Sequence, residues 1–173
     1  MDHTDLKILA LLQEDASLTV AEVAGRVHLS QTPCWRRIQR LEASGVIRRR
    51  VAILDPAAVG IDITVFVAIE TGDHSSAWLA RFAALLSDMP EVMEVHRMAG
   101  DIDYLLKICV PNMTAYDVFY RKLIEAVPLK NVTSRFAMER VKSTTAYPLP
   151  AHRERTLSRA LKLDAPNDRE SQT

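Results

Sequence analysis

The sequence predicts an α+β protein of two domains: a small helical domain, then a four-stranded antiparallel sheet with two helices on one face. Two observations predict this arrangement. Apolar residues recur at helical spacing through residues 4–45, and the period then changes to the alternation of strands, interrupted by two further helical stretches. The 173 residues, of which 48% are hydrophobic and 25% charged, suffice for two small hydrophobic cores.

The first two helices have clear sequence signals. Ile8, Leu9 and Leu12 give the first helix its apolar positions. Thr19 and Glu22 form a T-x-x-E capping box, in which each side chain bonds the backbone N–H of the other residue. One face of the second helix is apolar, with Val20, Val23, Ala24 and Val27.

A third helix follows after a tight turn. Ser30 is expected as its N-cap, and Pro33 lies in its first turn, where the missing N–H costs nothing. Gly45 ends the helix. The apolar positions at i, i+4 and i+7 predict a buried seam of Cys34, Ile38 and Leu41.

The outward side of this third helix is polar and basic. A short preformed helix with exposed Gln, Thr and Arg side chains suits the major groove of DNA, so the segment predicts a DNA-binding helix-turn-helix. Base edges and phosphates are expected to contact Ser30, Gln31, Thr32, Trp35, Arg36, Arg37, Gln39, Arg40, Arg48, Arg49 and Arg50.

The distribution of charge supports a polyanionic partner. The whole chain balances 22 basic against 22 acidic residues, but residues 26–50 hold seven arginines and one acid, a net charge of +6. The alternative is that these arginines only form a solvated helix face. Residues 48–50 are three consecutive arginines, placed where the wing of a winged helix-turn-helix would meet phosphates.

Residues 1–54 thus form the first domain, with Val46 to Leu54 expected as a short strand or wing. Residues 55–60 form a hinge, because Pro56 disfavours a helical conformation for the residue before it. Branched apolar residues then recur at every second position, which predicts the first strand of the second domain: Ile61, Ile63, Val65, Val67 and Ile69.

The second domain, residues 61–147, continues in the order helix, strand, strand, helix, strand. The helices are expected over Ser75 to Met89, ended by Pro90, and from a cap at Thr114 to Pro128; the remaining strands cover 92–98, 104–110 and Val132 to Val141, with a tight turn at Gly100-Asp101. This order is that of the ferredoxin-like βαββαβ fold. Both helices then cover one face of the sheet, and the bare face predicts a homodimer.

Two segments resemble the Lrp/AsnC (feast/famine) family of transcription regulators. These are SQTPCWRRIQRLEASGVI at residues 30–47 and MAGDIDYLLKICVPNMTAY at residues 98–116. The segments HSSAW, DMPEV and TSRFAMERVKSTTAYP are similar to the DecR-like branch, which is associated with cysteine sensing. The resemblance covers residues 2 to about 147 and implies a DNA-binding regulator whose dimers assemble into higher oligomers.

The resemblance also implies an amino-acid effector, with cysteine favoured, bound near the glycine-containing turn of the second domain. The residues implicated are Met98, Gly100, Asp101, Asp103, Tyr104, Thr133, Ser134 and Phe136. The two carboxylates can hold an ammonium group, and a turn at Gly100 leaves backbone N–H groups accessible to a carboxylate. The alternative is that Gly100-Asp101 is simply a hairpin turn capped by Asp103.

Other kinds of function have less support. The five histidines share no metal-ligand spacing, no catalytic triad or phosphate-binding loop is present, and no apolar run is long enough to span a membrane. We therefore expect a cytoplasmic protein that is not an enzyme and needs no metal or cofactor. Two alternatives remain: an effector-independent nucleoid-organising member of the same family, and a stand-alone amino-acid-binding module. The tail, 148–173, predicts at most a short helix from His152 to Leu163.

Overall fold

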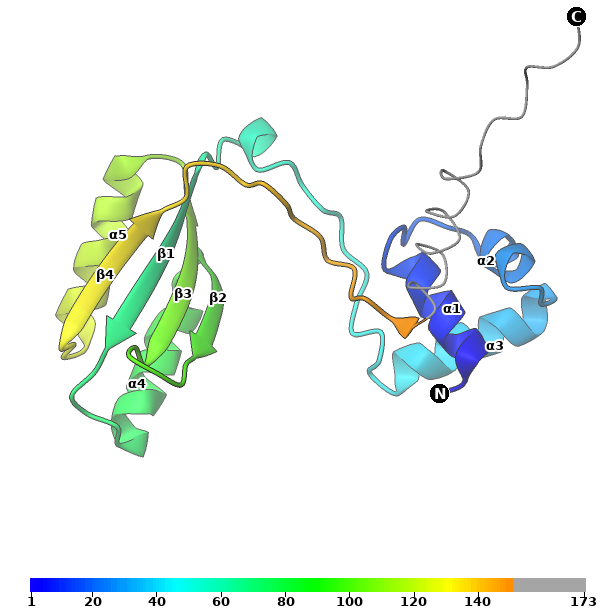
Figure 1. Ribbon diagram of the computed structural model, residues 1–173, viewed down its shortest axis with the longest axis horizontal. Helices are drawn as coiled ribbons and strands as arrows, with labels where there is room; N and C mark the ends of the chain where they lie inside the picture. Colours follow the sequence, from blue (N-terminus) through cyan, green and yellow to red (C-terminus); the bar gives the residue numbers. More distant parts are fainter. Residues whose placement is uncertain (151–173) are drawn as a thin grey trace, which may run out of the picture. The chain divides into compact units, whose positions relative to one another are not determined.

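The computed structural model describes residues 1–150, which form two compact units (Figure 1). Unit 1 contains Met1–Ala52 together with the described residues from Lys142 onward, and unit 2 contains Ile53–Val141. The predicted helix from His152 to Leu163 lies outside the described residues. Within residues 1–150, no helix is both long and apolar enough to cross a membrane.

Unit 1 is a three-helix domain built from α1 (His3–Leu12), α2 (Val20–Arg26) and α3 (Gln31–Ala43). The capping box predicted at Thr19 is present with both of its hydrogen bonds. Most of the predicted apolar positions form one core, to which Leu11 also belongs; it contains Ile8, Leu11, Leu12, Val23, Ala24, Val27, Cys34, Ile38 and Leu41. Leu9, Val20 and Ile47 pack against this core while partly exposed.

The strand expected over Val46 to Leu54 is absent, because these residues have no regular secondary structure. Ile47 instead closes the C-terminal end of α3, where its N–H donates to the Leu41 carbonyl at 3.0 Å and its side chain packs on the helical core. Gly45 has a φ of +75°, the left-handed conformation that commonly ends a helix. A strand also needs a neighbouring strand for its hydrogen bonds, and no described residue pairs with this segment.

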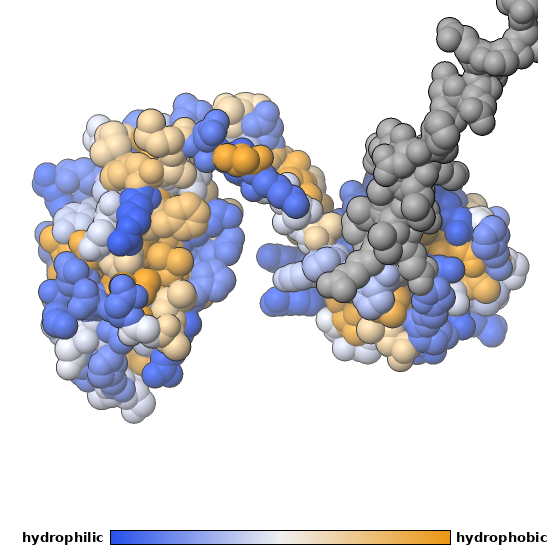
Figure 2. Space-filling model, in the orientation of Figure 1, coloured by the Kyte–Doolittle hydropathy of each residue, from blue (hydrophilic) through white to orange (hydrophobic). Residues whose placement is uncertain are grey.

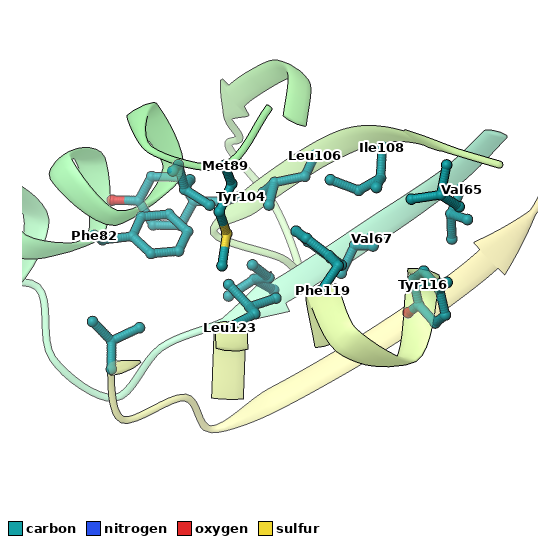
Figure 3. Close-up of a cluster of buried hydrophobic side chains, with 14 of the residues drawn as sticks. Val65, Val67, Phe82, Met89, Tyr104, Leu106, Ile108, Tyr116, Phe119 and Leu123 are labelled. Carbon is teal, nitrogen blue, oxygen red and sulfur yellow. The ribbon is translucent and has the colours of Figure 1, made fainter. Parts of the chain in front are cut away.

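Unit 2 is a four-stranded antiparallel sheet in the order β2-β3-β1-β4, as the ferredoxin-like prediction requires. Its strands are β1 (Ile63–Glu70), β2 (Val92–Arg97), β3 (Tyr104–Val110) and β4 (Asn131–Phe136), and its helices are α4 (Ser76–Ser87) and α5 (Met113–Ala126). Both helices pack on the same face of the sheet (Figure 1), and the side chains between them form one core (Figure 3).

The alternation predicted for β1 decides which residues enter that core. Val65, Val67 and Ile69 are fully buried against the helices, so Phe66 and Ala68 belong to the opposite face of the sheet. In α4, Trp78 and Phe82 stack with ring centroids 4.7 Å apart. The sheet of unit 2 therefore has one face in the core and one without helices.

Two expectations about unit 2 are wrong in detail. The N-cap of α5 is Asn112 rather than Thr114, because the Asn112 Oδ1 atom accepts the Ala115 N–H at 2.9 Å. Asn is among the strongest N-capping residues and ranks above Thr. The last strand ends at Phe136 rather than Val141, since its partner β1 begins at Ile63 and only the Ala137 N–H bonds beyond the strand, to Thr64.

Candidate DNA-binding surface and effector loop

Helix α3 has one buried side and one exposed side. Cys34, Ile38 and Leu41 are buried as predicted, and burial raises the pKa of the Cys34 thiol. Gln31, Thr32, Trp35, Arg36 and Gln39 are all exposed on the other side. Trp35 is 51% exposed, although Trp is highly buried on average in folded proteins. Ser30 is the N-cap by position, but its hydroxyl makes no capping bond.

The turn before α3 has a constrained backbone. His28 has a φ of +57°, in the left-handed region that few residues other than glycine adopt and in which Asn, Asp and His are enriched. The following Leu29 N–H bonds back to the Ala24 carbonyl at 2.9 Å, which closes the end of α2. This conformation sets the direction in which the chain enters α3.

Two of the arginines predicted to contact phosphates are bonded to acids of α1. Arg37 Nη1 lies 2.6 Å from Asp2 Oδ2 and 2.8 Å from Asp5 Oδ1, and Arg40 Nη2 lies 2.8 Å from Asp5 Oδ2. Burial alone would raise the pKa of Asp5, but the Asp2 N–H and the arginines outweigh it and hold that pKa below its usual value. Asp2 and Asp5 also form a capping box at the start of α1, a local pattern that would have been the signal for these two acids.

The remaining predicted arginines are in two different situations. Arg50 bonds Glu42 at 3.0 Å, so it folds back toward α3. Glu42 also accepts a bond from Gln39 at 3.1 Å. In contrast, Arg36, Arg48 and Arg49 are exposed, and none of them is bonded to another described residue. These three side chains therefore present unpaired cationic groups to solvent.

The predicted effector loop of unit 2 connects β2 to β3. Gly100 has a φ of +139°, a conformation that favours glycine, and the loop is closed by a bond from the Met98 N–H to the Asp103 carbonyl at 2.8 Å. Asp101 is exposed and makes no hydrogen bond to any described residue. Its carboxylate is therefore accessible to a ligand.

Asp103 has a structural role that Asp101 lacks. Its Oδ2 accepts the Thr71 N–H at 2.8 Å, and its own N–H donates to the Ile69 carbonyl at 2.9 Å. The other carboxylate oxygen lies 3.9 Å from Nδ1 of His74. Asp103 thus joins the loop to the end of β1 through its side chain, while its carbonyl closes the loop on Met98, and one carboxylate oxygen has no hydrogen bond to a described residue.

The other predicted effector residues do not share one surface. Tyr104 is buried, with its ring 5.0 Å from that of Phe82 (Figure 3). Ser134 is hydrogen-bonded to the Tyr116 hydroxyl on the helix side of the sheet. Phe136 contacts the same Tyr116 ring edge-on at 5.0 Å. Thr133 pairs with Ala68 and so belongs to the opposite face.

No metal centre is formed within residues 1–150: no three His, Cys, Asp or Glu side chains lie close enough together to hold an ion. The arrangement contains an exposed basic helix in one unit and a glycine-containing loop on a ferredoxin-like sheet in the other. Together these define a DNA-binding protein with a separate regulatory domain.

Comparisons with known proteins agree with this class. A family described as winged helix-turn-helix DNA-binding matches residues 1–48, and the Lrp/AsnC ligand binding domain matches residues 64–147. The chain belongs to the Lrp/AsnC family of DNA-binding transcriptional regulators. Its relatives in this family are transcriptional regulators rather than enzymes.

Individual relatives match over most of their length. The chain is 49% identical to the glutamate uptake regulatory protein of Zymomonas mobilis over 150 residues, which are 87% of this chain and 92% of the relative. It is 47% identical to the DNA-binding transcriptional activator DecR of Escherichia coli over 150 residues, 86% of this chain and 99% of DecR.

Solved structures give the same result. An AsnC family transcriptional regulator from Agrobacterium tumefaciens matches with a TM-score of 0.82 and 55% identity, over 86% of this chain and 97% of that one. The L-Met complex of the regulator NMB0573 from Neisseria meningitidis matches with a TM-score of 0.82 and 34% identity, over 87% of this chain and 97% of that one.

Proposed function

We propose that this protein regulates transcription in response to an amino acid and that it reads DNA with α3. The observation that supports α3 as the recognition helix is that its apolar side chains lie on a buried side and its polar side chains on an exposed side. Cys34, Ile38 and Leu41 fix the helix on its core, while Gln31, Thr32 and Arg36 are exposed without internal partners. Side chains near the N-terminal end of a recognition helix are those that reach base edges.

We assign phosphate contacts to those arginines that make no ion pair within the protein. Arg48 and Arg49 follow α3, are exposed, and are not bonded to described residues, so they can neutralise DNA phosphates without breaking an ion pair. Arg50 would first have to leave Glu42. The residues thus divide into base-reading side chains on α3 and positioning side chains after it.

The effector is proposed to bind at the loop around Gly100, with Asp101 facing the ammonium group. Cysteine is the first candidate because the chain resembles the DecR-like branch, and DecR is one of its relatives. The regulator from Neisseria, which is 34% identical, was solved with L-Met, which supports an amino acid as the ligand class. The Zymomonas relative is named for glutamate uptake, so glutamate belongs in the same screen.

A homodimer is proposed to form through the sheet face that no helix covers. Phe66 on this face is 38% exposed, and its neighbours across the sheet are Lys107 and Arg135. Apolar and polar residues also lie side by side on the visible surface of the sheet domain (Figure 2). A two-fold dimer would present two copies of α3 to two half-sites one or more DNA turns apart.

The test combines gel shifts with analytical ultracentrifugation on the full chain. Genomic fragments from around the protein's own gene are the DNA probes, and each of the twenty amino acids is added in turn. We expect retarded complexes and a change in affinity or oligomer distribution with one amino acid or a small set. DNA binding that no amino acid alters would reject the effector and favour the effector-independent alternative. Absence of DNA binding would reject the reading helix.

A further inference from the structure

Four charged side chains connect the start of α1 to the middle of α3. Asp5 is at the centre of this cluster and only 1% exposed. Its Oδ1 accepts bonds from Arg37 at 2.8 Å and Arg40 at 3.0 Å, and its Oδ2 accepts bonds from Arg40 at 2.8 Å and the Asp2 N–H at 3.0 Å. Each carboxylate oxygen therefore has two donors, and no acceptor position is left for another partner.

The two arginines differ in what they leave free. Arg37 is 28% exposed, and its Nη1 is shared between Asp2 and Asp5. Arg40 is 62% exposed, and only its Nη2 contacts Asp5. A guanidinium has five N–H donors, so Arg40 keeps donors that are accessible to solvent while one edge is held by the protein. Arg40 also lies one helical turn after Arg36, on the same side of α3.

The net charge of this cluster is zero, because two carboxylates balance two guanidinium groups. The cluster therefore adds no long-range attraction for DNA, and its value for binding must come from geometry. A guanidinium that is already oriented loses less side-chain entropy when it binds a phosphate.

We infer that Asp5 is a positioning residue for DNA recognition: it orients the guanidinium of Arg40 toward one phosphate and keeps Arg37 out of the DNA interface. This inference rests on the reading helix proposed above. It gives two arginines of α3, which are one helical turn apart, different roles. Arg37 stabilises the packing of α1 on α3, and Arg40 contacts DNA. A phosphate contact of fixed geometry also fixes the register of α3 over the base edges.

The decisive variant is Asp5→Asn in the full chain, tested on the genomic fragment that the protein binds best and on random duplex. Removing a negative charge near α3 would, by electrostatics alone, strengthen binding to both DNAs. Positioning predicts that specific binding weakens by about tenfold, the equivalent of one charge-assisted hydrogen bond, while random DNA binds as well or better. The matched control is Asp2→Asn, which removes the same charge, keeps an N-capping residue for the Asp5 N–H and, of the two arginines, contacts only Arg37. The ratio of its affinity for specific DNA to its affinity for random DNA should equal that of wild type.

Variants of the arginines keep the test valid if Asp5→Asn does not fold. Arg40→Lys retains the charge but not the planar guanidinium, so it should also lower the ratio of the affinity for specific DNA to the affinity for random DNA. Arg40→Gln should flatten the salt dependence by up to about 0.9 in log–log slope, as expected for one lost phosphate contact. Arg37→Gln should lower the melting temperature and leave that slope unchanged.

Three outcomes would overturn the inference. Asp5→Asn could strengthen binding to both DNAs equally. Arg37→Gln and Arg40→Gln could show the same salt dependence of binding, or Arg40→Lys could keep the wild-type ratio of specific to random affinity. Arg36→Ala, measured in the same series, separates this failure from that of the reading helix. If Arg36→Ala loses specificity and Asp5→Asn does not, only the positioning role fails. If Arg36→Ala keeps full specificity, the reading helix itself is wrongly assigned.

Discussion

The side-chain amide of Gln13 forms two hydrogen bonds with the backbone of Tyr147. Gln13 Nε2 donates to the Tyr147 carbonyl at 2.9 Å, and the Tyr147 N–H donates to Gln13 Oε1 at 2.9 Å. Gln13 is the C-cap of α1, so a residue that follows unit 2 in the chain completes unit 1. The two units are therefore connected twice, once on the way into unit 2 and once on the way out.

We expect Gln13→Ala to release this returning segment. The backbone N–H of Tyr147 would lose its acceptor, and one side-chain hydrogen bond is worth about 1 kcal/mol. Amide hydrogen exchange at Tyr147 should then accelerate by about fivefold. Gln31→Ala, which removes an exposed glutamine without this contact, is the control and should leave the exchange rate unchanged. Unaltered exchange in Gln13→Ala would mean that other contacts hold the segment.

Arg36 and Arg49 should respond differently to substitution by alanine. Arg36 lies on the exposed side of α3, so Arg36→Ala should cost about 1–3 kcal/mol on the preferred DNA and relax its specificity. Arg49→Ala should weaken all sequences alike and flatten the salt slope by up to about 0.9. Titrations on specific and random duplexes at several salt concentrations measure both effects. Equal losses on both duplexes for Arg36→Ala would contradict the base-reading role.

The sequence was sufficient for many features that depend on near neighbours in the chain, although it did not identify Asn112 as the N-cap of α5. The capping box at Thr19, the buried seam of Cys34 and the alternation through Val65 are all patterns of a few residues, and the structure confirms them. The order of strands and helices along the chain matches the ferredoxin-like fold, and the sheet is the four-stranded antiparallel sheet expected for that fold.

Features that depend on distant residues could not be predicted in the same way. Asp5 and Arg40 are 35 positions apart, and Gln13 and Tyr147 are 134 apart, so no periodicity relates them. By composition the seven arginines of residues 26–50 form one basic group, yet acids at the start of α1 bind Arg37 and Arg40. Composition measures charge, whereas only the fold shows which charges are already paired.

The backbone of His28 gives a test of the turn before α3. His28→Val should destabilise unit 1 by about 1–2 kcal/mol, because a β-branched residue is strained at a φ of +57°. The His28 side chain is exposed, so little packing is lost. His28→Asn is the matched control, since Asn tolerates this conformation, and it should be nearly neutral. Thermal unfolding followed by Trp35 fluorescence reports on unit 1 when Trp78, the other tryptophan, is replaced by Phe. Equal unfolding midpoints for His28→Val and His28→Asn would contradict backbone strain at this position.

The depressed pKa of Asp5 predicts how the stability of unit 1 depends on pH. A carboxyl group whose pKa is lower in the folded state stabilises that state above its unfolded pKa, near 3.8, and the contribution is lost as the pH falls through the folded value. Wild type should therefore be more stable than Asp5→Asn at pH 7, and the difference should shrink below about pH 4. Asp101→Asn, which alters a carboxylate without a described partner, is the control: the difference in stability between it and wild type should be the same at pH 7 and below about pH 4. A constant difference across this range would contradict the assignment to the Asp5 carboxylate.

The last prediction separates the two carboxylates of the effector loop. Asp101 is exposed and without a described partner, so Asp101→Ala should remove the response to the amino acid and leave effector-free DNA binding intact. The response in wild type should be a change of about 5–150-fold in DNA affinity, the usual range of coupling between sites. Asp103→Ala would also release the Thr71 N–H, so it cannot distinguish ligand binding from loop structure.

Asp103→Asn resolves this ambiguity, because the amide oxygen can still accept from the Thr71 N–H while the negative charge is gone. Loss of the response in Asp103→Asn with an unchanged melting temperature would assign its free oxygen to the effector. A normal response would restrict Asp103 to holding the loop on β1, and Asp101 would be the carboxylate that faces the ammonium group. An effector can regulate only if it binds one state of the protein better than another. The response of each variant must therefore be measured as a shift in DNA affinity with and without the amino acid, alongside calorimetric binding of the amino acid alone.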